Sequence, residues 1–350
     1  MTATPATLAS LHAPWRIGID VGGTFTDLVL AESDGSVRVV KVPSVPGEPA
    51  AGVMQALEQL GRDLGEDLRE VLGRCALFVH GSTIATNTVL ERKGATVGLI
   101  GTKGFRDTLE IRRGIRVNPW DHRTPYAPVL VPRFLRMTVA GRLDRDGQEL
   151  EALDVEEVLS AKQAFQRNGV DSIAVCLFNS YANPAHEQAC AQVLQADGQP
   201  VEWLSLSHEI VPLLGEYERT ATTVLNAYVA PRTVGYLTAL DGRLRALGLP
   251  QPMLLIQNNG GSVSVGQVSN KPATLLLSGP AAGVGALEIA RDALAVDNLL
   301  SLEIGGTSAD VMLMQEGQVP VSEQLSVGGY DTALASVEIH TIGAGGGTIA

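Results

Sequence analysis

The sequence feature that most constrains the fold is a glycine-rich turn after the first apolar run, within residues 16–27. The run ends on Asp20, adjacent glycines occupy positions 22 and 23, and a second apolar run follows Asp27. Adjacent glycines let the backbone approach a ligand, and their N–H groups suit phosphate oxygens. The motif is neither the lysine-containing phosphate loop nor the dinucleotide fingerprint, because it lacks the lysine and a returning strand replaces the helix. A hairpin whose glycines only turn the chain is the simpler alternative.

The same plan returns near the other end of the sequence, at residues 299–311. There an apolar run ends on Glu303, a Gly-Gly-Thr-Ser turn occupies residues 305–308, and Asp310 opens the returning run. Two such hairpins predict two similar half-domains that hold one nucleotide between them.

Composition narrows the class of protein. A chain of 350 residues predicts about two domains. The net charge of −12, with no cluster of Lys and Arg, argues against a nucleic-acid partner. The three cysteines lack metal-ligand spacing and suit a reducing compartment. Residues 1–14 lack the pattern of a signal peptide and are expected to be a disordered lead-in, and no apolar run reaches the ~18 residues of a membrane span. We therefore expect a cytoplasmic protein without a membrane partner.

Strands and helices are expected to alternate along the chain, which favours α/β layering. Strands are expected at residues 37–42, 173–178 and 201–206, and helices at 50–63, 155–167 and 184–195. A boundary near residues 195–200 separates an N-terminal region, 15–197, from a second region, 198–350. Residues 104–150 are expected to form an inserted segment within the first region.

Three further stretches carry polar groups at positions where ligands bind. His80-Gly81-Ser82-Thr83 stands where a short strand meets a helix, and its side chains either cap the helix or face an anion or a polarised carbonyl. Asn258 and Asn259 precede two glycines, where they either hold a turn or offer amide donors. Glu216 and Arg219 are one helical turn apart and are read as a surface ion pair worth a few tenths of a kcal/mol.

Together these motifs resemble the hydantoinase A and 5-oxoprolinase family, within the superfamily of sugar kinases, actin and heat-shock chaperone ATPases. The resemblance rests on six motifs in the same order, which span nearly the whole chain from residue 16 onward. The longest motif is residues 80–95, and the others include residues 104–113, 216–231 and 340–347. The small residues of 277–286 match the helix that connects the lobes in that superfamily.

The resemblance implies a fold and an activity. The fold is α/β, a two-lobed actin-like (ribonuclease H-like) ATPase, with a second lobe that is incomplete at its C-terminal end. The activity is ATP-dependent hydrolysis of a small cyclic amide, of the hydantoin, oxoproline or lactam type, in which the carbonyl oxygen is phosphorylated before water attacks. The cofactors are ATP and Mg²⁺ or another divalent cation. The partner is a hydantoinase B-type subunit in a hetero-oligomer.

The resemblance also implies roles for individual residues. The catalytic residues are Asp20, His80, Asn87 and Arg219. The residues that bind the cofactor are Gly22, Gly23, Thr24, Thr26, Gly305, Gly306, Thr307, Ser308, Gly345 and Gly346. The residues that bind substrate are Ser82, Thr83, Asn226, Asn258 and Asn259. The metal is assigned to Asp20 and Glu303.

One departure from the family pattern leaves the reaction open. The second hairpin carries Glu303 where the family has aspartate, which shifts the carboxylate by more than about 1 Å. The displaced carboxylate either still reaches Mg²⁺ through water or weakens the use of ATP. Separately from this departure, two alternatives stand beside the amidase. One is a carboxylase subunit that activates acetone or acetophenone with ATP. The other, from a different class, is a nucleotide-gated regulator or scaffold.

Overall fold

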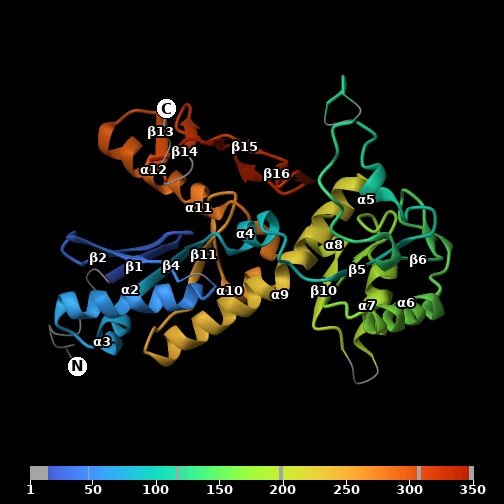
Figure 1. The fold of residues 1–350 in the computed structure, drawn as a ribbon, viewed down its shortest axis with the longest axis horizontal. Coiled ribbons are helices and arrows are strands. Elements are labelled where there is room, and N and C mark those ends of the chain that lie inside the picture. The colour runs from blue at the N-terminus through green and yellow to red at the C-terminus, as the bar shows by residue number, and fades with distance from the viewer. Residues whose placement is uncertain are drawn as a thin grey trace, which may run out of the picture.

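The described chain contains three larger β-sheets and three two-stranded ones, and one long helix connects the two largest sheets (Figure 1). A computed structural model describes residues 15–45, 47–115, 118–121, 123–196, 200–305 and 309–346. The expected lead-in, 1–14, and residues 197 and 198 at the expected boundary lie outside the described residues. In the described part, no helix is both long and apolar enough to cross a membrane.

The first sheet has six strands in the order β12-β11-β4-β1-β2-β3. Its centre is parallel, since β4 pairs in parallel with both β1 and β11, whereas β2 and β3 continue from β1 as antiparallel strands. The strands are β1 (Trp15–Val21), β2 (Phe25–Ala31), β3 (Val37–Pro43), β4 (Cys75–Ser82), β11 (Leu254–Ile256) and β12 (Ser262–Ser264). Helices α2 (Pro49–Leu64) and α3 (Leu68–Gly73) follow β3, and α4 (Ile84–Leu90) follows β4.

The second sheet is fully parallel, in the order β10-β9-β5-β6. Its strands are β5 (Val97–Thr102), β6 (Arg136–Val139), β9 (Ser172–Cys176) and β10 (Trp203–Leu206). Helices α6 (Val155–Arg167) and α7 (Ala185–Gln195) accompany it, as the sequence predicts to within one residue. Short elements complete this unit: α5 (Thr108–Ile111), η1 (Arg133–Leu135), β7 (Arg142–Leu143), β8 (Glu149–Glu151) and α8 (Ser207–Ile210).

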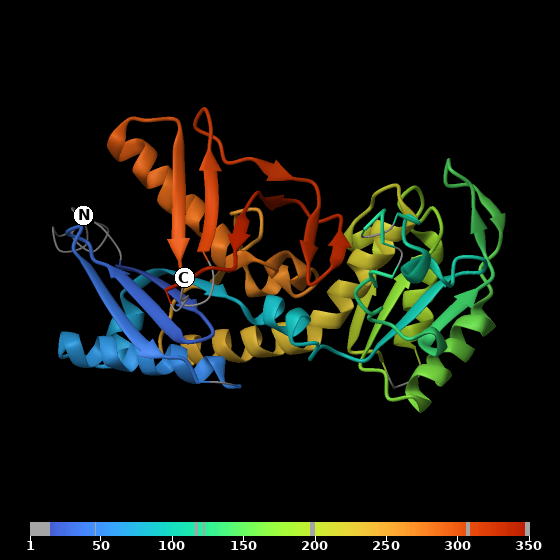
Figure 2. The ribbon, with the colours of Figure 1, turned by 45° about the horizontal axis from the view of Figure 1, so that its top comes forward.

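Helix α9 (Glu216–Ala246) connects the two units. With 31 residues it is about 46 Å long, and it runs from the second sheet to the underside of the first (Figures 1 and 2). Pro231 lies inside the helix, and the backbone N–H of Ala95 bonds the carbonyl of Tyr228 at 2.9 Å, close to this proline. The first half of α9 is buried on nearly all sides, which suits a helix enclosed by protein.

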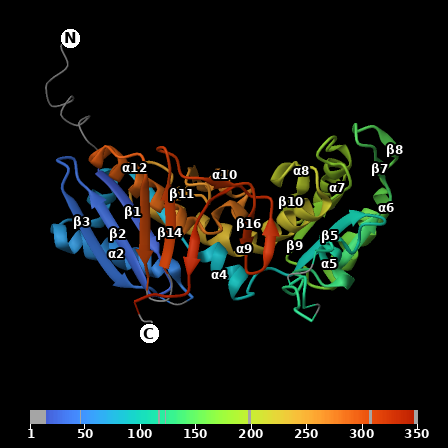
Figure 3. The same cartoon turned by 90° about the horizontal axis from the view of Figure 1, so that it is seen from above.

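The third unit contains the second glycine hairpin. Its antiparallel sheet has the order β13-β14-β19, and Figure 3 shows it standing beside the first sheet. The elements are β13 (Leu299–Ile304), β14 (Ala309–Met314), β15 (Val321–Ser322), β16 (Leu325–Val327), β17 (Tyr330–Thr332), β18 (Ser336–Val337) and β19 (His340–Ile342). The preceding chain forms α10 (Val265–Val268), η2 (Pro272–Leu275), α11 (Ser278–Ala281) and α12 (Gly283–Leu294). The small-residue segment at 277–286 thus forms two helices in place of one.

The first sheet contains strands from both of the regions that the sequence analysis separates at residue 197. Strands β11 and β12 come from the second region of sequence but join the first sheet beside β4. The expected insertion, 104–150, contributes β6 to the second sheet and therefore belongs to its core. Sheet membership depends on pairing between distant segments, which order along the chain does not specify.

Close packing beneath α9 gives a first prediction, at Gly94. A Cβ at Gly94 would lie 2.3 Å from Cε1 of the buried Tyr228, so Gly94→Ala should lower the free energy of unfolding by about 1–3 kcal/mol. Gly235 is the control. It lies exposed in α9, the helix that contains Tyr228, and no atom lies within 4 Å of a Cβ added there. Gly235→Ala should raise the unfolding free energy by about 0.5–1 kcal/mol. Denaturant unfolding measures both, and equal effects of the two substitutions would contradict the packing described.

Candidate functional site

The first glycine hairpin joins β1 to β2 and presents Asp20 next to β4. Asp20 is opposite Asp27 in the antiparallel pair and beside Gly81 in the parallel pair. A Cβ at Gly81 would lie 2.8 Å from Oδ1 of Asp20. The carboxylate therefore lies across the backbone of Gly81, in space that a side chain there would take.

Ser44 fixes the hairpin turn from the end of β3. Its hydroxyl donates to the carbonyl of Gly22 at 2.8 Å, and its N–H bonds the carbonyl of Thr24 at 2.9 Å. The turn itself closes through the N–H of Gly22 and the carbonyl of Phe25 at 3.0 Å. Gly23 and Thr24 remain exposed, so their N–H groups and the Thr24 hydroxyl are open to a ligand.

The second hairpin repeats this geometry with its own acid. Glu303 is opposite Asp310, as Asp20 is opposite Asp27. A Cβ at Gly283 of α12 would lie 2.0 Å from Oε1 of Glu303, so this carboxylate also lies over a glycine. The N–H of Gly346 bonds the carbonyl of Gly305 at 2.9 Å, which brings the C-terminal glycine run to the hairpin. Gly306, Thr307 and Ser308 lie outside the described residues.

The two acids lie near enough for the charge of Asp20 to act on Glu303. The surrounding walls desolvate Asp20 and raise its pKa, and the charge of Asp27 adds to the rise against a smaller opposing effect of Lys41. Desolvation likewise raises the pKa of Glu303, with further repulsion from Asp310 and from Asp20 itself. Neither acid has an ion pair in the described chain, although the charge of Lys41 favours the charged form of Asp20.

These two carboxylates suit a hydrated divalent cation. No group of three potential ligand side chains occurs among the described residues, which does not favour a cage of protein ligands such as zinc takes. Mg²⁺ commonly keeps several waters and uses one or two carboxylates together with phosphate oxygens. Asp20 and Glu303 provide such a pair of carboxylates.

A polar cavity of about 260 Å³ adjoins the first hairpin. It is lined by the backbone at Gly22 and Gly23 and by side chains from the junction of β4 and α4. Thr83 Oγ1 donates to the carbonyl of Val21 at 3.2 Å and accepts from Asn87 Nδ2 at 3.0 Å. The predicted residues Ser82, Thr83 and Asn87 thus lie together beside the hairpin.

His80 lies on the other face of the first sheet. It pairs in register with Ile19, one position before Asp20, so the alternation of the strand points it away from the carboxylates. Its side chain is 1% exposed, and Nε2 lies 3.0 Å from the hydroxyl of Tyr236 in α9. Burial lowers its pKa to about 4, so the imidazole is neutral at pH 7. The structure therefore separates His80 from the ligand side of the hairpin.

Two other predicted residues are occupied by internal contacts. Thr26 is fully buried beneath the hairpin, 3.1 Å from the hydroxyl of Ser44. Asn226 uses its amide within the core, donating to Ser205 Oγ at 3.0 Å and accepting from the N–H of Ala273 at 3.1 Å. Neither side chain reaches the space between the hairpins.

Arg219 is a buried structural residue, and the expected surface pair with Glu216 is wrong. The arginine side chain is 0% exposed, and Nη2 bonds both Glu216 oxygens at 2.7 Å and the carbonyl of Leu177 at 2.8 Å. Its Nε donates to Ser207 Oγ at 3.1 Å, and Ser207 in turn donates to the buried Glu187 at 2.6 Å. The guanidinium thus ties the start of α9 to the second sheet, because a buried charge needs this full set of partners.

The remaining predicted amides lie at the end of β11. Asn259 caps its own turn by accepting from the N–H of Gly261 at 2.9 Å. Asn258 is 2% exposed, and its Nδ2 has no hydrogen-bond partner in the described chain. Its backbone bonds Thr274 and Val337, so it lies where the first sheet meets the third unit.

Sequence reasoning missed three contributors to the site. Ser44 stands between prolines and gives no local sign of its contact with the hairpin. Gly283 was read only as part of a small-residue helix, although its missing side chain makes room for Glu303. Arg232 of α9 lines the cavity beside Asn87, and it follows Pro231 at the end of a recognised motif. Of these three residues, only Arg232 could have been suspected from the sequence, because it directly follows a recognised motif.

Comparisons with known proteins match the chain along most of its length. The model described as hydantoinase/oxoprolinase N-terminal region matches residues 16–198, and the model described as hydantoinase/oxoprolinase matches residues 219–350. Caprolactamase subunit alpha of Pseudomonas jessenii is 35% identical over 96% of this chain and 48% of the relative. The acetophenone carboxylase gamma subunit of Aromatoleum aromaticum is 31% identical over 99% of this chain and 48% of the relative.

Solved structures match the fold as well. The crystal structure of the ATP-dependent caprolactamase from Pseudomonas jessenii superposes with a TM-score of 0.88 at 35% identity. The nucleotide-free structure of acetone carboxylase superposes with a TM-score of 0.85 at 27% identity. Each match covers 95% of this chain and 48% of the other, so the chain spans about half the length of these relatives. The mixed α/β fold is therefore that of these ATPase-type subunits.

The raised pKa of Asp20 predicts how stability depends on pH. A carboxyl whose folded-state pKa exceeds its unfolded value of about 3.9 disfavours folding when ionised, so the unfolding free energy should fall as pH rises above about 4. Asp20→Asn removes this cost, and the variant should be more stable than the wild type at pH 7 but not at pH 3.

Asp34 provides the control of opposite sign. Its pKa is lowered by hydrogen bonds from Ser36, so Asp34→Asn should be less stable than the wild type at pH 7. Thermal unfolding across pH measures both variants. A loss of stability in Asp20→Asn at pH 7 would show that Asp20 is a structural acid.

Proposed function

Because the chain belongs to the hydantoinase/oxoprolinase family, we propose that it is the nucleotide-binding part of an ATP-dependent enzyme that hydrolyses a small cyclic amide. The observation that carries the proposal is the pair of glycine hairpins that present Asp20 and Glu303 to each other. The sequence match to an ATP-dependent caprolactamase supports a lactam-type substrate.

The first hairpin is proposed to bind the phosphates through its backbone. The exposed turn at Gly23 and Thr24 offers N–H groups and one hydroxyl, and Ser44 holds the turn in shape without occupying them. Gly305 and Gly346 extend the same arrangement on the second hairpin. Donors fixed in advance stabilise developing charge more than mobile ones, because they need no reorganisation during the reaction.

Asp20 and Glu303 are proposed to hold Mg²⁺ through water and to position the phosphates. When bound, ATP would supply a phosphoryl group to the amide oxygen, which would make the carbonyl carbon a better target for water before the C–N bond breaks, and the metal would offset phosphate charge. Glu303 reaches further than an aspartate, and Gly283 provides the space for the extra methylene.

The cavity beside the first hairpin is the proposed substrate pocket. Asn87 and Thr83 form one polar pair there, and Ser82 adds a hydroxyl that accepts from the N–H of Ile84 at 3.3 Å. An amide and hydroxyls suit a cyclic amide, which has one carbonyl acceptor and one N–H donor. Arg232 lies at the cavity without an ion pair in the described chain and is available to orient the substrate.

A heteromeric assembly completes the proposal. The relatives are named as alpha, beta and gamma subunits, which supports a partner subunit for this protein. We propose that the partner is of the hydantoinase B type and that it completes hydrolysis.

The second candidate is an ATP-dependent ketone carboxylase. The observation that favours it is the similarity to acetophenone carboxylase over 99% of the chain and to the acetone carboxylase fold. Its substrate is a ketone, which has no N–H donor. ATP consumption that depends on bicarbonate and a ketone, without any response to lactams, would favour this candidate.

The function is tested with the full-length protein and its partner subunit. Caprolactam, 5-oxoproline and hydantoin should be opened only when Mg²⁺ and ATP are present. Asp20→Asn should lower turnover by about 10²-fold or more, because the metal and phosphates lose their anchor. Chromatographic assay of the ring-opened product measures turnover. Ring opening in chelated, nucleotide-free buffer would overturn the proposal.

Gly283 provides a further test of the role of Glu303. Gly283→Ala should displace the Glu303 carboxylate and raise the KM for ATP, because a Cβ there would lie 2.0 Å from Oε1. Gly285→Ala is the matched control in the same helix, with no atom within 4 Å of the added carbon, and it should leave the KM unchanged. Unchanged ATP kinetics in Gly283→Ala would remove Glu303 from the site.

A further inference from the structure

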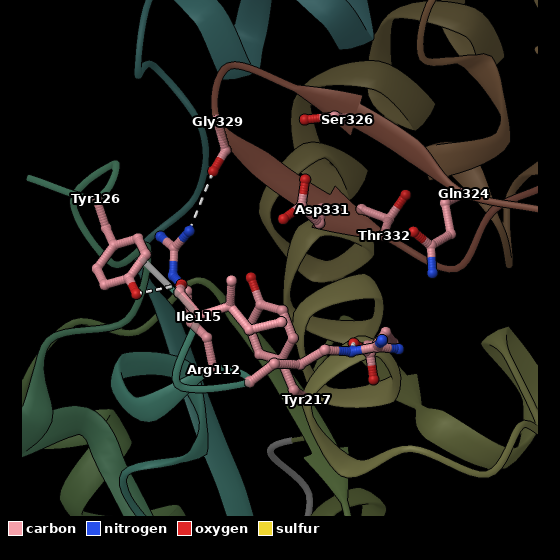
Figure 4. Close-up of a pocket in the computed structure, with 11 residues that line it drawn as sticks. Arg112, Ile115, Tyr126, Tyr217, Gln324, Ser326, Gly329, Asp331 and Thr332 are labelled. Atoms are coloured by element: carbon pink, nitrogen blue, oxygen red, sulfur yellow. Dashed lines mark hydrogen bonds and ion pairs between the residues drawn. The ribbon is translucent and has the colours of Figure 1, made fainter. Parts of the chain in front are cut away.

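A second cavity lies away from both glycine hairpins. It measures about 400 Å³ and is enclosed by three separate parts of the chain (Figure 4). One wall is the segment after α5, another is the first turn of α9, and the third is the hairpin of β16 and β17. None of its lining residues belongs to the first or the second glycine hairpin. The role proposed for those hairpins therefore leaves this cavity unexplained.

Side chains of both charges line this cavity. Arg112 and Arg113 come from the segment after α5, Glu218 from α9 and Asp331 from β17. Arg113 pairs with Glu218. Asp331 is exposed to the cavity and has no ion pair in the described chain. One carboxylate therefore remains to receive a cation from a ligand.

Arg112 is held in place and keeps N–H donors that are not bonded to the protein. Its guanidinium lies 4.5 Å from the centre of the Tyr126 ring, and it donates to the carbonyls of Ala127 at 2.9 Å and Gly329 at 3.4 Å. A guanidinium has five N–H donors, so donors remain for an anion. The backbone at Arg112 has φ of +54°, a conformation that few residues other than glycine adopt. Strain of this kind is tolerated where the side chain has to be placed accurately.

Tyr217 adds a hydroxyl at the wall of this cavity. The residue is 9% exposed, and its hydroxyl has no hydrogen bond in the described chain. Figure 4 shows Tyr217 of α9 and Asp331 of β17 on opposite sides of the same space. The Tyr217 hydroxyl is therefore open to a hydrogen bond with a ligand in the cavity.

We propose that this cavity binds a small zwitterion with an apolar body. Its ammonium group would lie between the Asp331 carboxylate and the Tyr217 hydroxyl, and its carboxylate would meet the free N–H groups of Arg112. The rings of Tyr126 and Tyr217 and the side chain of Ile115 would cover the apolar body. A ligand with a single charge leaves one of these sites unpaired.

The proposed function suggests which zwitterion this is. Hydrolysis of a lactam yields an amino acid, with its new amine and carboxylate at the two ends of the opened ring. On that basis, which rests on the proposed function, the ligand is the ring-opened product. Two hydrogen bonds join the walls of the cavity. Arg112 donates to the carbonyl of Gly329, and the Tyr330 hydroxyl donates to the carbonyl of Pro128 at 2.6 Å. A bound product would therefore strengthen the contact between the second and third units.

Titration calorimetry on the full-length protein tests the site directly. The probe is 6-aminohexanoate, with hexanoate and hexylamine as singly charged controls of similar length. Only the zwitterion should bind measurably. Asp331→Asn should weaken its binding by about tenfold to a hundredfold, and Tyr217→Phe by about threefold to tenfold, from the usual strengths of charged and neutral hydrogen bonds.

Two further variants separate this site from the nucleotide site. Asp121→Asn changes an exposed acid outside the cavity and should leave binding unchanged. Asp20→Asn should abolish turnover yet bind 6-aminohexanoate as the wild type does. If the wild type binds the zwitterion but opens no lactam, the proposed function fails and the site stands. Absence of binding by the wild type, or equal binding of hexanoate, overturns the site.

Discussion

The placement of Asp20 and Glu303 against glycines of neighbouring elements is the constraint on which the two hairpins depend. Desolvation by the surrounding protein raises the pKa of both carboxylates, and Asp20 adds to the rise at Glu303. No protein cation pairs with either acid in the described chain. A protein tolerates such an arrangement only if the rest of the fold compensates for it, and the large shared core of the first and second sheets supplies that compensation.

The two hairpins achieve this arrangement by the same local means. Each acid lies over a glycine of a neighbouring element, Gly81 of β4 for Asp20 and Gly283 of α12 for Glu303. Absence of a side chain at these glycines lets a carboxylate lie flat against the backbone. The similarity between the two hairpins therefore includes the glycine that each acid packs against. This supports the proposal that the hairpins form two halves of one nucleotide site.

Arg219 illustrates how a residue in a recognised motif can serve the fold. Its charge is fully enclosed by Glu216, Ser207 and two backbone carbonyls, which fix the start of α9 to the second sheet. Because α9 continues beneath the first sheet, this network sets how the two units are placed. Residues of α9 line both cavities, the one at α4 and the one at α5, so the Arg219 network at the start of this helix helps to position both.

The sequence by itself determined the local elements and the two glycine turns with their acids. Glycine turns after apolar runs, and helices such as 155–167, follow from periodicity and turn chemistry, which act over a few residues. Tertiary structure alone decided which face each side chain takes. His80 and Thr26 sit in motifs but point beneath the sheet, because strand alternation and pairing with β1 fix their direction. Pairing of β11 with β4 and the meeting of Arg112, Tyr217 and Asp331 join segments far apart in sequence, and only packing of the whole chain brings them together.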